Sequence, residues 1–138
     1  MSVDRITLDT NILIYAVDKD AGNRHQRAMA IVDDAVERDC ILILQVLSEF
    51  FSTVTRKGKM PIGDAKEQVQ DWLLLFPTIL PKSSTLTLAI NAVENHRLSF
   101  WDAMLWAAAK QSGVNVLLSE DFQHGRELEG VLFHNPFL

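Results

Sequence analysis

The sequence predicts an α/β fold in which helices cover both faces of a parallel sheet. Two runs of strand length, residues 40–44 (CILIL) and 114–118 (VNVLL), are apolar or nearly so, which is typical of strands buried on both faces. Such segments alternate with segments of helical period, and hairpin signals are almost absent. The chain has 138 residues, 48% hydrophobic and 22% charged, so we expect one domain over residues 1–138 with its own core.

The first strand, residues 3–8 (VDRITL), is short and ends at an acidic residue. The polar segment 9–11 (DTN) follows directly, before a short helix over residues 12–17 and a turn over residues 19–23. The carboxylate of Asp9 is therefore expected at the C-terminal edge of the strand, where ligands bind in open α/β sheets. The alternative is that this segment only caps the helix.

Apolar residues at three- and four-residue spacing predict five further helices. They are expected over residues 24–38, 45–57, 62–75, about 83–97 and 100–112. Pro61 suits the start of the third of these helices, Pro77 follows its end, and Gly113 ends the last one. Short strands over residues 78–80 and 131–133 complete the expected order of elements.

Composition and charge narrow the class of protein. No apolar run reaches the 18 or so residues that a membrane span needs, and the N-terminus lacks the features of an export signal. The single cysteine, Cys40, cannot form an internal disulfide, which agrees with a reducing cytoplasm. With 13 basic and 18 acidic residues the net charge is −5. We therefore expect a cytoplasmic protein without membrane contact, whose acids suit a basic partner or a bound cation.

Two acids follow buried strands, and a third lies on a helix. Asp121 comes just after the strand over residues 114–118, as Asp9 does after the first strand. If the two strands are parallel neighbours, both carboxylates emerge at the same edge of the sheet. Glu49 lies on the polar side of the helix over residues 45–57, so it is either solvated, the ordinary outcome, or directed into a polar cleft.

Asp102 has two interpretations. It follows Ser99 at the spacing of a capping box, so its carboxylate could simply close the first turn of the helix. The residues around it are apolar, however, and an unpaired carboxylate at the entry of a buried helix is costly unless it meets a cation.

Four segments together resemble a known family. They are LDTNILIYA (8–16), QVLSEFF (45–51), SFWDAMLWAAA (99–109) and LLSEDFQHG (117–125). In this order and spacing they resemble the PIN-domain ribonucleases, and more narrowly the VapC-type toxins of bacterial toxin–antitoxin pairs. The likeness runs from Ile6 to Phe133. It implies a PIN-like three-layer α/β/α fold with a central parallel sheet of about five short strands.

The resemblance also implies a metal-dependent endoribonuclease that cleaves RNA by a metal-activated water. The family's catalytic and metal-binding acids fall on Asp9, Glu49, Asp102 and Asp121. Supporting polar positions fall on Thr10, Asn11 and Ser119, and on Glu120, which is an extra acid beside the favoured Asp121. Converging carboxylates repel one another, and Mg²⁺ or Mn²⁺ with oxygen ligands would remove that conflict.

The sequence and the resemblance indicate contacts with RNA, with an antitoxin and with a second copy of the chain. Arg56, Lys57 and Lys59 are the best candidates for contacts with RNA phosphates, although a solvated helix end with favourable C-terminal charges explains them equally well. The resemblance implies a cognate antitoxin that covers the acidic pocket, and it implies a homodimer. Trp72, Trp101 and Trp106 are interpreted as core or interface residues, with stacking of a base on Trp101 as the alternative.

Two rival functions are weighed against this prediction. A HAD-like phosphatase would need a second aspartate two residues after Asp9, where this chain has Asn11. A catalytically silent PIN-like module that only binds protein would not need all four acids. The four histidines show no metal-ligand spacing, and His124, the one near Asp121, is the only one singled out for testing.

Overall fold

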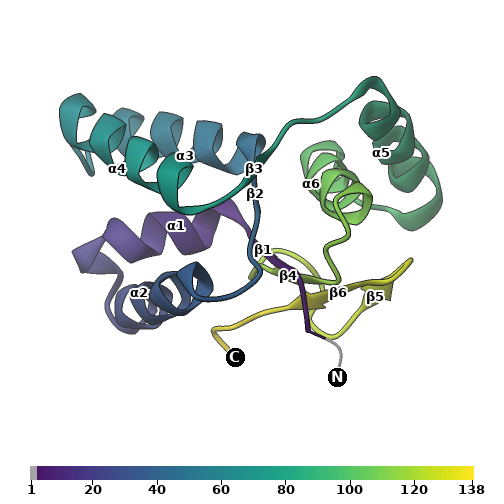
Figure 1. Ribbon diagram of the computed structural model, residues 1–138, viewed down its shortest axis with the longest axis horizontal. Helices are drawn as coiled ribbons and strands as arrows, with labels where there is room; N and C mark the ends of the chain where they lie inside the picture. Colours follow the sequence, from purple (N-terminus) through teal and green to yellow (C-terminus); the bar gives the residue numbers. More distant parts are fainter. Residues whose placement is uncertain (1–2) are drawn as a thin grey trace.

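The computed structural model describes residues 3–138 and arranges them as six α-helices around short strands (Figure 1). In chain order the elements are β1 (Ile6–Leu8), α1 (Thr10–Val17), the 3₁₀ helix η1 (Lys19–Ala21), α2 (Asn23–Val36), β2 (Leu42–Ile43), α3 (Leu44–Arg56), α4 (Ile62–Leu75), β3 (Thr78–Ile79), α5 (Ser83–His96), α6 (Phe100–Gln111), β4 (Val116–Leu118), β5 (Glu127–Leu128) and β6 (Val131–His134). The predicted alternation of strands and helices is confirmed.

The strands form a mostly parallel sheet. A four-stranded sheet has the order β1-β4-β6-β5, and β1, β4 and β6 run parallel. A parallel pair, β2 and β3, adjoins it through the bridge between Ile6 and Cys40. Helices α1 to α4 lie on one side of these strands and α5 and α6 on the other (Figure 1). The predicted fold, a parallel sheet between layers of helices, is therefore confirmed.

One strand was not predicted. Residues of β5 pair antiparallel with β6, and Leu128 lies opposite Val131 in a tight hairpin. The two residues of its turn, Glu129 and Gly130, have φ values of 48° and 90°. Such a turn requires positive φ at both positions, and a glycine supplies this readily while a glutamate does so only with strain. The turn has no Asn-Gly or Asp-Gly pair, and for this reason the hairpin was not predicted from the sequence.

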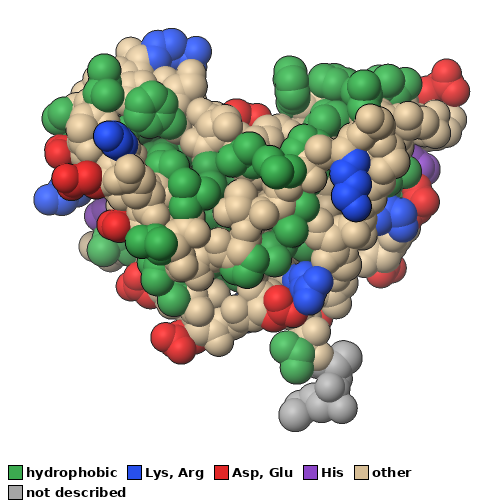
Figure 2. Space-filling model, turned by 45° about the horizontal axis from the view of Figure 1, so that its top comes forward, with side chains coloured by type: hydrophobic (Ala, Val, Ile, Leu, Met, Phe, Trp, Pro, Cys, Tyr) green, Lys and Arg blue, Asp and Glu red, His purple; other side chains and the backbone are tan. Residues whose placement is uncertain are grey.

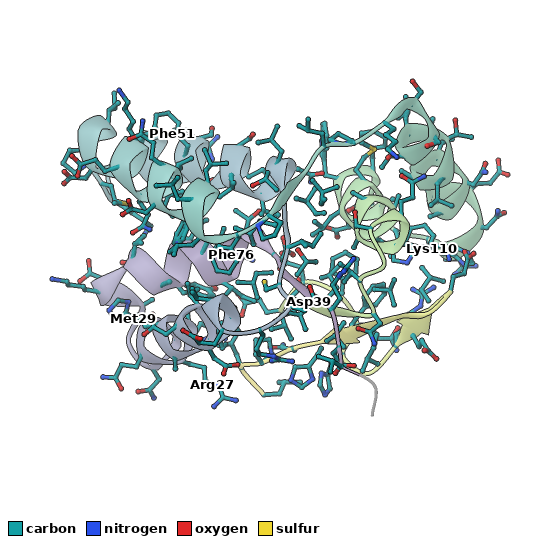
Figure 3. All side chains as sticks on the ribbon, viewed as in Figure 1. Arg27, Met29, Asp39, Phe51, Phe76 and Lys110 are labelled. Atoms are coloured by element: carbon teal, nitrogen blue, oxygen red, sulfur yellow. The ribbon has the colours of Figure 1, made fainter. Side chains whose placement is uncertain are left out.

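The core lies between the sheet and the helices. The strand residues Leu8, Leu117 and Phe133 are at most 1% exposed, and Phe50 of α3 and Trp106 of α6 are fully buried against them. Because α6 carries small alanines along its buried side, it can approach the strands closely. Phe76, directly after α4, is also buried in this core (Figure 3).

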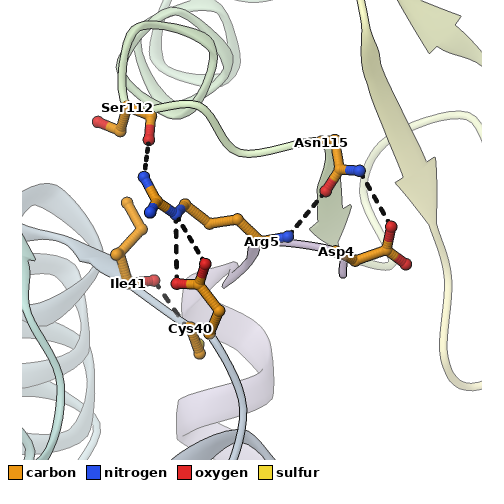
Figure 4. A network of polar contacts seen from close by, with 7 residues as sticks. Asp4, Arg5, Cys40, Ile41, Ser112 and Asn115 are labelled. Atoms are coloured by element: carbon orange, nitrogen blue, oxygen red, sulfur yellow. Dashed lines mark hydrogen bonds and ion pairs between the residues drawn. The ribbon is translucent and has the colours of Figure 1, made fainter. Parts of the chain in front are cut away.

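A polar network fixes the start of β1, at the end of the sheet opposite to Asp9 (Figure 4). The guanidinium of Arg5 donates to both carboxylate oxygens of Asp39, at 3.2 and 3.1 Å, and to the carbonyl of Ser112 at 2.8 Å. The side-chain oxygen of Asn115 accepts from the Arg5 amide at 2.9 Å. These contacts join three segments and fix the register of β1 between its neighbours.

Within residues 3–138, none of the helices has the length and apolar character that crossing a membrane requires.

Candidate active site

An acidic cavity of about 420 Å³ opens at the C-terminal ends of β1 and β4. Five carboxylates line it. Asp18 is paired with Lys59, and the other four come from four different parts of the chain and are Asp9, Glu49, Asp102 and Asp121. The sequence places these residues up to 112 positions apart. The structure therefore brings together all four acids that were predicted to form the site.

Asp9 is the most enclosed of the four, with 6% of its surface exposed. It is also the N-cap of α1, because its Oδ1 accepts the amide of Thr10 at 2.7 Å. Its Oδ2 accepts the hydroxyl of Ser119 at 2.6 Å. Burial raises the pKa of Asp9 to about 6, the two hydrogen bonds oppose that rise, and the negative charges of Asp121 and Asp102 add to it. The capping role and the cavity role thus coexist in one side chain.

Glu49 faces the cavity and not the solvent. Its two oxygens accept from the hydroxyl of Thr10 at 2.9 Å and from the amide of Gln45 at 2.8 Å. The amide of Gln45 also donates to the carbonyl of Trp101 at 3.2 Å. Residues of α1, α3 and α6 therefore hold the Glu49 carboxylate in place. Gln45 was not predicted as a site residue, although its position one turn before Glu49 on the polar side of the helix was a usable signal.

Asp121, and not Glu120, lines the cavity. The carboxylate of Asp121 accepts the side-chain amide of Asn11 at 3.0 Å, and its backbone amide donates to the hydroxyl of Ser119 at 3.0 Å. Burial, followed by the charges of Asp102, Glu120 and Glu49, raises the pKa of Asp121.

Glu120 makes a different set of contacts. Its carboxylate accepts the hydroxyl of Tyr15 and pairs with Arg24 at 3.2 Å. Burial and the contact with this carboxylate raise the pKa of Tyr15 to about 12. The two adjacent acids therefore point in different directions, and Glu120 anchors the loop that carries Asp121.

Asp102 lies in the first turn of α6 and lines the cavity. Ser99 is the N-cap residue of this helix, but its side chain makes no capping hydrogen bond. The capping-box interpretation of Asp102 is therefore wrong. Its neighbours Trp101 and Leu105 also line the cavity, so this carboxylate is set among apolar side chains, as the sequence suggested.

Basic side chains form one end of the same cavity. Arg56, Lys57 and Lys59 all line it, close to the C-terminus of α3. Lys59 is already paired with Asp18 at 2.7 Å. The charged groups that act most strongly on the pKa values of Asp9 and Asp121 are all carboxylates. The basic residues therefore lie at the rim and do not neutralise the acidic centre.

Comparison with known proteins places this arrangement in a family. The model of the PIN domain family matches residues 6–126, which is most of the chain and includes all four acids. The chain belongs to the PIN domain family. No curated protein gives a significant match.

Several solved structures have the same fold as this PIN domain. One is a toxin–antitoxin complex from Klebsiella pneumoniae, with 16% identity, coverage of 95% of this chain and 97% of that one, and a TM-score of 0.65. Another is VapC20 of Mycobacterium tuberculosis, described as a toxin that cleaves the sarcin–ricin loop, with 18% identity, coverage of 81% and 86%, and a TM-score of 0.65. A third is VapBC2 of Rickettsia felis bound to promoter DNA, with 13% identity, coverage of 94% and 97%, and a TM-score of 0.66.

The donor set of this PIN domain suits a hard divalent cation. All four charged donors are carboxylates, and the neighbouring Thr10, Asn11 and Ser119 add neutral oxygen and amide groups. Among residues 3–138, no group of three acidic, histidine or cysteine side chains is already spaced to hold an ion. Neutral donors hold the carboxylates of Glu49 and Asp121 in their present positions. These hydrogen bonds are the ones that a cation would have to replace.

The histidines contribute nothing to the described site. His124 stacks near His134, with 5.1 Å between ring centroids, and its Nδ1 accepts the amide of Asn135 at 2.9 Å. Neither ring lines the acidic cavity. Trp72 and Trp106 are buried, as predicted, whereas Trp101 is 63% exposed.

Proposed function

We propose that this PIN domain is a metal-dependent endoribonuclease and the toxin of a toxin–antitoxin pair. One observation carries the proposal: the carboxylates of Asp9, Glu49, Asp102 and Asp121 line one cavity, and repulsion among them helps to raise the pKa values of Asp9 and Asp121. A protein keeps such a cluster at a cost in stability, which a bound cation offsets.

Asp9, Glu49, Asp102 and Asp121 are the residues that would hold Mg²⁺ or Mn²⁺. When bound, such an ion lowers the pKa of water for attack on a phosphodiester and stabilises the negative charge that develops on the leaving oxygen. Oxygen-only donor sets favour these ions over zinc or copper.

The neighbouring residues of the chain orient these acids. Ser119 binds both Asp9 and the backbone of Asp121, Thr10 binds Glu49, and Asn11 binds Asp121. Their part in the reaction is to fix the direction of the carboxylates. Arg56 and Lys57, at the rim, would contact phosphates of the RNA and offset the net negative charge of the protein.

Partners of this PIN domain follow from the same proposal. The Klebsiella structure is, by its description, a toxin–antitoxin complex, which supports a cognate antitoxin for this chain. We propose that this antitoxin covers the acidic cavity. We further propose a cytoplasmic homodimer.

Incubation of the purified protein with RNA tests the function. We expect cleavage with Mg²⁺ or Mn²⁺, loss of cleavage in EDTA, and recovery when the ion is restored. Asp102→Asn should remove cleavage, and it should also remove any growth arrest that induction of the wild-type protein causes. Cleavage that resists the chelator would contradict the metal mechanism. Release of phosphate from a phosphomonoester without RNA cleavage would support the phosphatase instead.

A further inference from the structure

The exposed indole of Trp101 lies at the junction of two cavities. It lines the acidic cavity and also a second cavity of about 650 Å³, whose apolar lining comes from Leu44, Pro81, Trp101 and Met104. We call this second cavity the apolar cavity. Gln45 and Glu49 line both cavities as well, so the two cavities lie side by side. A large aromatic side chain that is 63% exposed therefore stands directly beside the acidic centre.

The position of Trp101 is fixed by its surroundings. Its carbonyl accepts the amide of Gln45 at 3.2 Å, and the same amide binds Glu49 at 2.8 Å. Its ring packs edge to face against Phe100, with 4.9 Å between centroids and 71° between ring planes. The indole is thus held in register with an acid of the site while most of its surface stays open to a ligand.

We propose that the apolar cavity is the subsite for one base of a single-stranded RNA, which stacks on the indole of Trp101. This inference rests on the proposed ribonuclease function and names a residue that positions the substrate. Bases of single strands stack readily on exposed aromatic rings, and every base offers a suitable face. A base held there would bring a phosphate next to it toward the four acids.

The path of the RNA over the surface is expected to run along helix α3. Gln45, beside Trp101, and Arg56, at the basic rim, are 11 residues apart on this helix. At 1.5 Å per residue the helix spans roughly 16 Å between them. A strand lying along α3 would therefore meet Trp101 at one end of the acidic cavity and the basic rim at the other, with the acids between.

A protein surface could also cover this face. Figure 2 shows hydrophobic side chains gathered on the side of the molecule where the two groups of helices meet. The apolar cavity, however, also contains the polar groups of Gln45, Ser48 and Glu49. Two of these residues, Gln45 and Glu49, also line the acidic cavity. A nucleotide offers an apolar face for the indole and, attached to it, a phosphate for the acidic cavity, which suits this pairing of an apolar and a charged space. The structure thus favours a base over a second copy of the chain.

Cleavage of matched RNAs tests this inference. One RNA is intact, and each of the others lacks the base at one nucleotide close to the scissile bond. We expect Trp101→Ala to lower kcat/KM about 5- to 150-fold on the intact RNA, the range typical of a lost base stack. On the RNA whose missing base is the one that stacks, the variant and the wild type should be equal. Trp101→Phe, which keeps a ring, should retain most of the activity.

Phe51→Ala is the matched control. Phe51 is an exposed aromatic residue of α3 that lines neither cavity (Figure 3). We expect its replacement to leave kcat/KM unchanged on all RNAs. An equal loss in Trp101→Ala on every RNA would overturn the base subsite. If Trp101→Ala also has a lower mass than the wild type in sedimentation experiments, Trp101 belongs to an interface between copies of the chain instead.

Binding without cleavage separates the two proposals. Trp101 is the exposed one of the three tryptophans, so quenching of fluorescence by a short single-stranded RNA in the Asp9→Asn protein reports on its ring. We expect quenching, and we expect Trp101→Phe in the same background to remove it. Cleavage by the wild type without quenching would overturn the base subsite alone. A protein that neither cleaves nor binds RNA would overturn the proposed function itself.

Discussion

The hydroxyl of Ser119 donates to Oδ2 of Asp9 across 2.6 Å and so joins the ends of two neighbouring parallel strands. Ser119 is fully buried just after β4, and Asp9 directly follows β1. The same hydroxyl oxygen accepts the backbone amide of Asp121 at 3.0 Å. A single side chain therefore sets the direction of one acid and the backbone of another, and several properties of the site depend on it.

Replacement of the Ser119 hydroxyl should make protons compete more strongly with a metal ion for the Asp9 carboxylate. The hydrogen bond from Ser119 lowers the pKa of Asp9 against the effect of burial, so Ser119→Ala should raise that pKa above its value of about 6. We expect the affinity for Mn²⁺ near neutral pH to fall, and its rise with pH to shift to higher pH, in calorimetric titrations. Ser119→Thr keeps the hydroxyl and should behave like the wild type. An unchanged pH dependence in Ser119→Ala would contradict the role of the hydrogen bond.

Asp9→Asn should abolish metal-dependent cleavage and yet stabilise the metal-free protein. Burial raises the pKa of Asp9 from 3.8 to about 6, so the folded protein holds this proton more tightly than the unfolded chain does. Protonated Asp9 therefore contributes about 3 kcal/mol to the free energy of unfolding. This contribution is fully present below about pH 4 and is lost as the pH rises through about 6. In urea melts with EDTA, the wild type should lose stability over this window and Asp9→Asn should lose less, with a remainder from Asp121, whose pKa is also raised. Full cleavage by Asp9→Asn would rule out its assigned role.

The two adjacent acids after β4 should give opposite results. Asp121 lines the acidic cavity, so Asp121→Asn should lower kcat/KM for RNA by about 100-fold or more, with little change in the free energy of unfolding. Glu120 is bound to Tyr15 and Arg24, so Glu120→Gln should lower the free energy of unfolding by about 1 kcal/mol or less and leave cleavage within a few-fold. Kinetics and urea melts of both variants check this. The reverse pattern would show that Glu120 is the acid that acts.

The basic rim should contribute through phosphate contacts. Arg56→Ala and Lys57→Ala should each weaken the binding of single-stranded RNA and reduce the slope of log K against log salt by about 0.7. Lys59 is already paired with Asp18 at 2.7 Å, so Lys59→Ala should change the slope less. Binding of RNA by the Asp9→Asn protein, measured from low to high salt, gives these slopes. Equal effects for all three variants would show that the ion pair with Asp18 opens when RNA binds.

Much of the fold was predictable because its buried strands and amphipathic helices leave periodic patterns. The expectation that Asp9, after β1, and Asp121, after β4, lie at the same edge followed from the rule that neighbouring parallel strands end at one edge of the sheet. The hairpin of β5 and β6 was missed because its turn uses Glu129 and not the usual Asn or Asp. The direction of Glu120 could not be predicted, because it depends on Tyr15 and Arg24, which are distant in sequence.

The capping box at Ser99, one of the two interpretations of Asp102, is wrong for a related reason. The spacing of Ser99 and Asp102 fits the motif, but a motif says nothing about competing partners in space. Likewise, periodicity placed Trp101 on a largely apolar helix without showing that its ring is left outside the core. Patterns along the chain describe local geometry well, and they fail where side chains from separate elements compete for one position.

The acids Glu49 and Asp102 belong to helices on opposite sides of the strands, α3 and α6 (Figure 1). In the protein alone, the amide of Gln45 links these two helices through its bonds to Glu49 and to the carbonyl of Trp101. A cation bound by both acids would link the two groups of helices far more strongly than one amide can. Binding of a cation and the rigidity of α3 and α6 are then coupled. Amide hydrogens in both helices should exchange more slowly when the cation is bound, and this would reveal the bound state without any substrate.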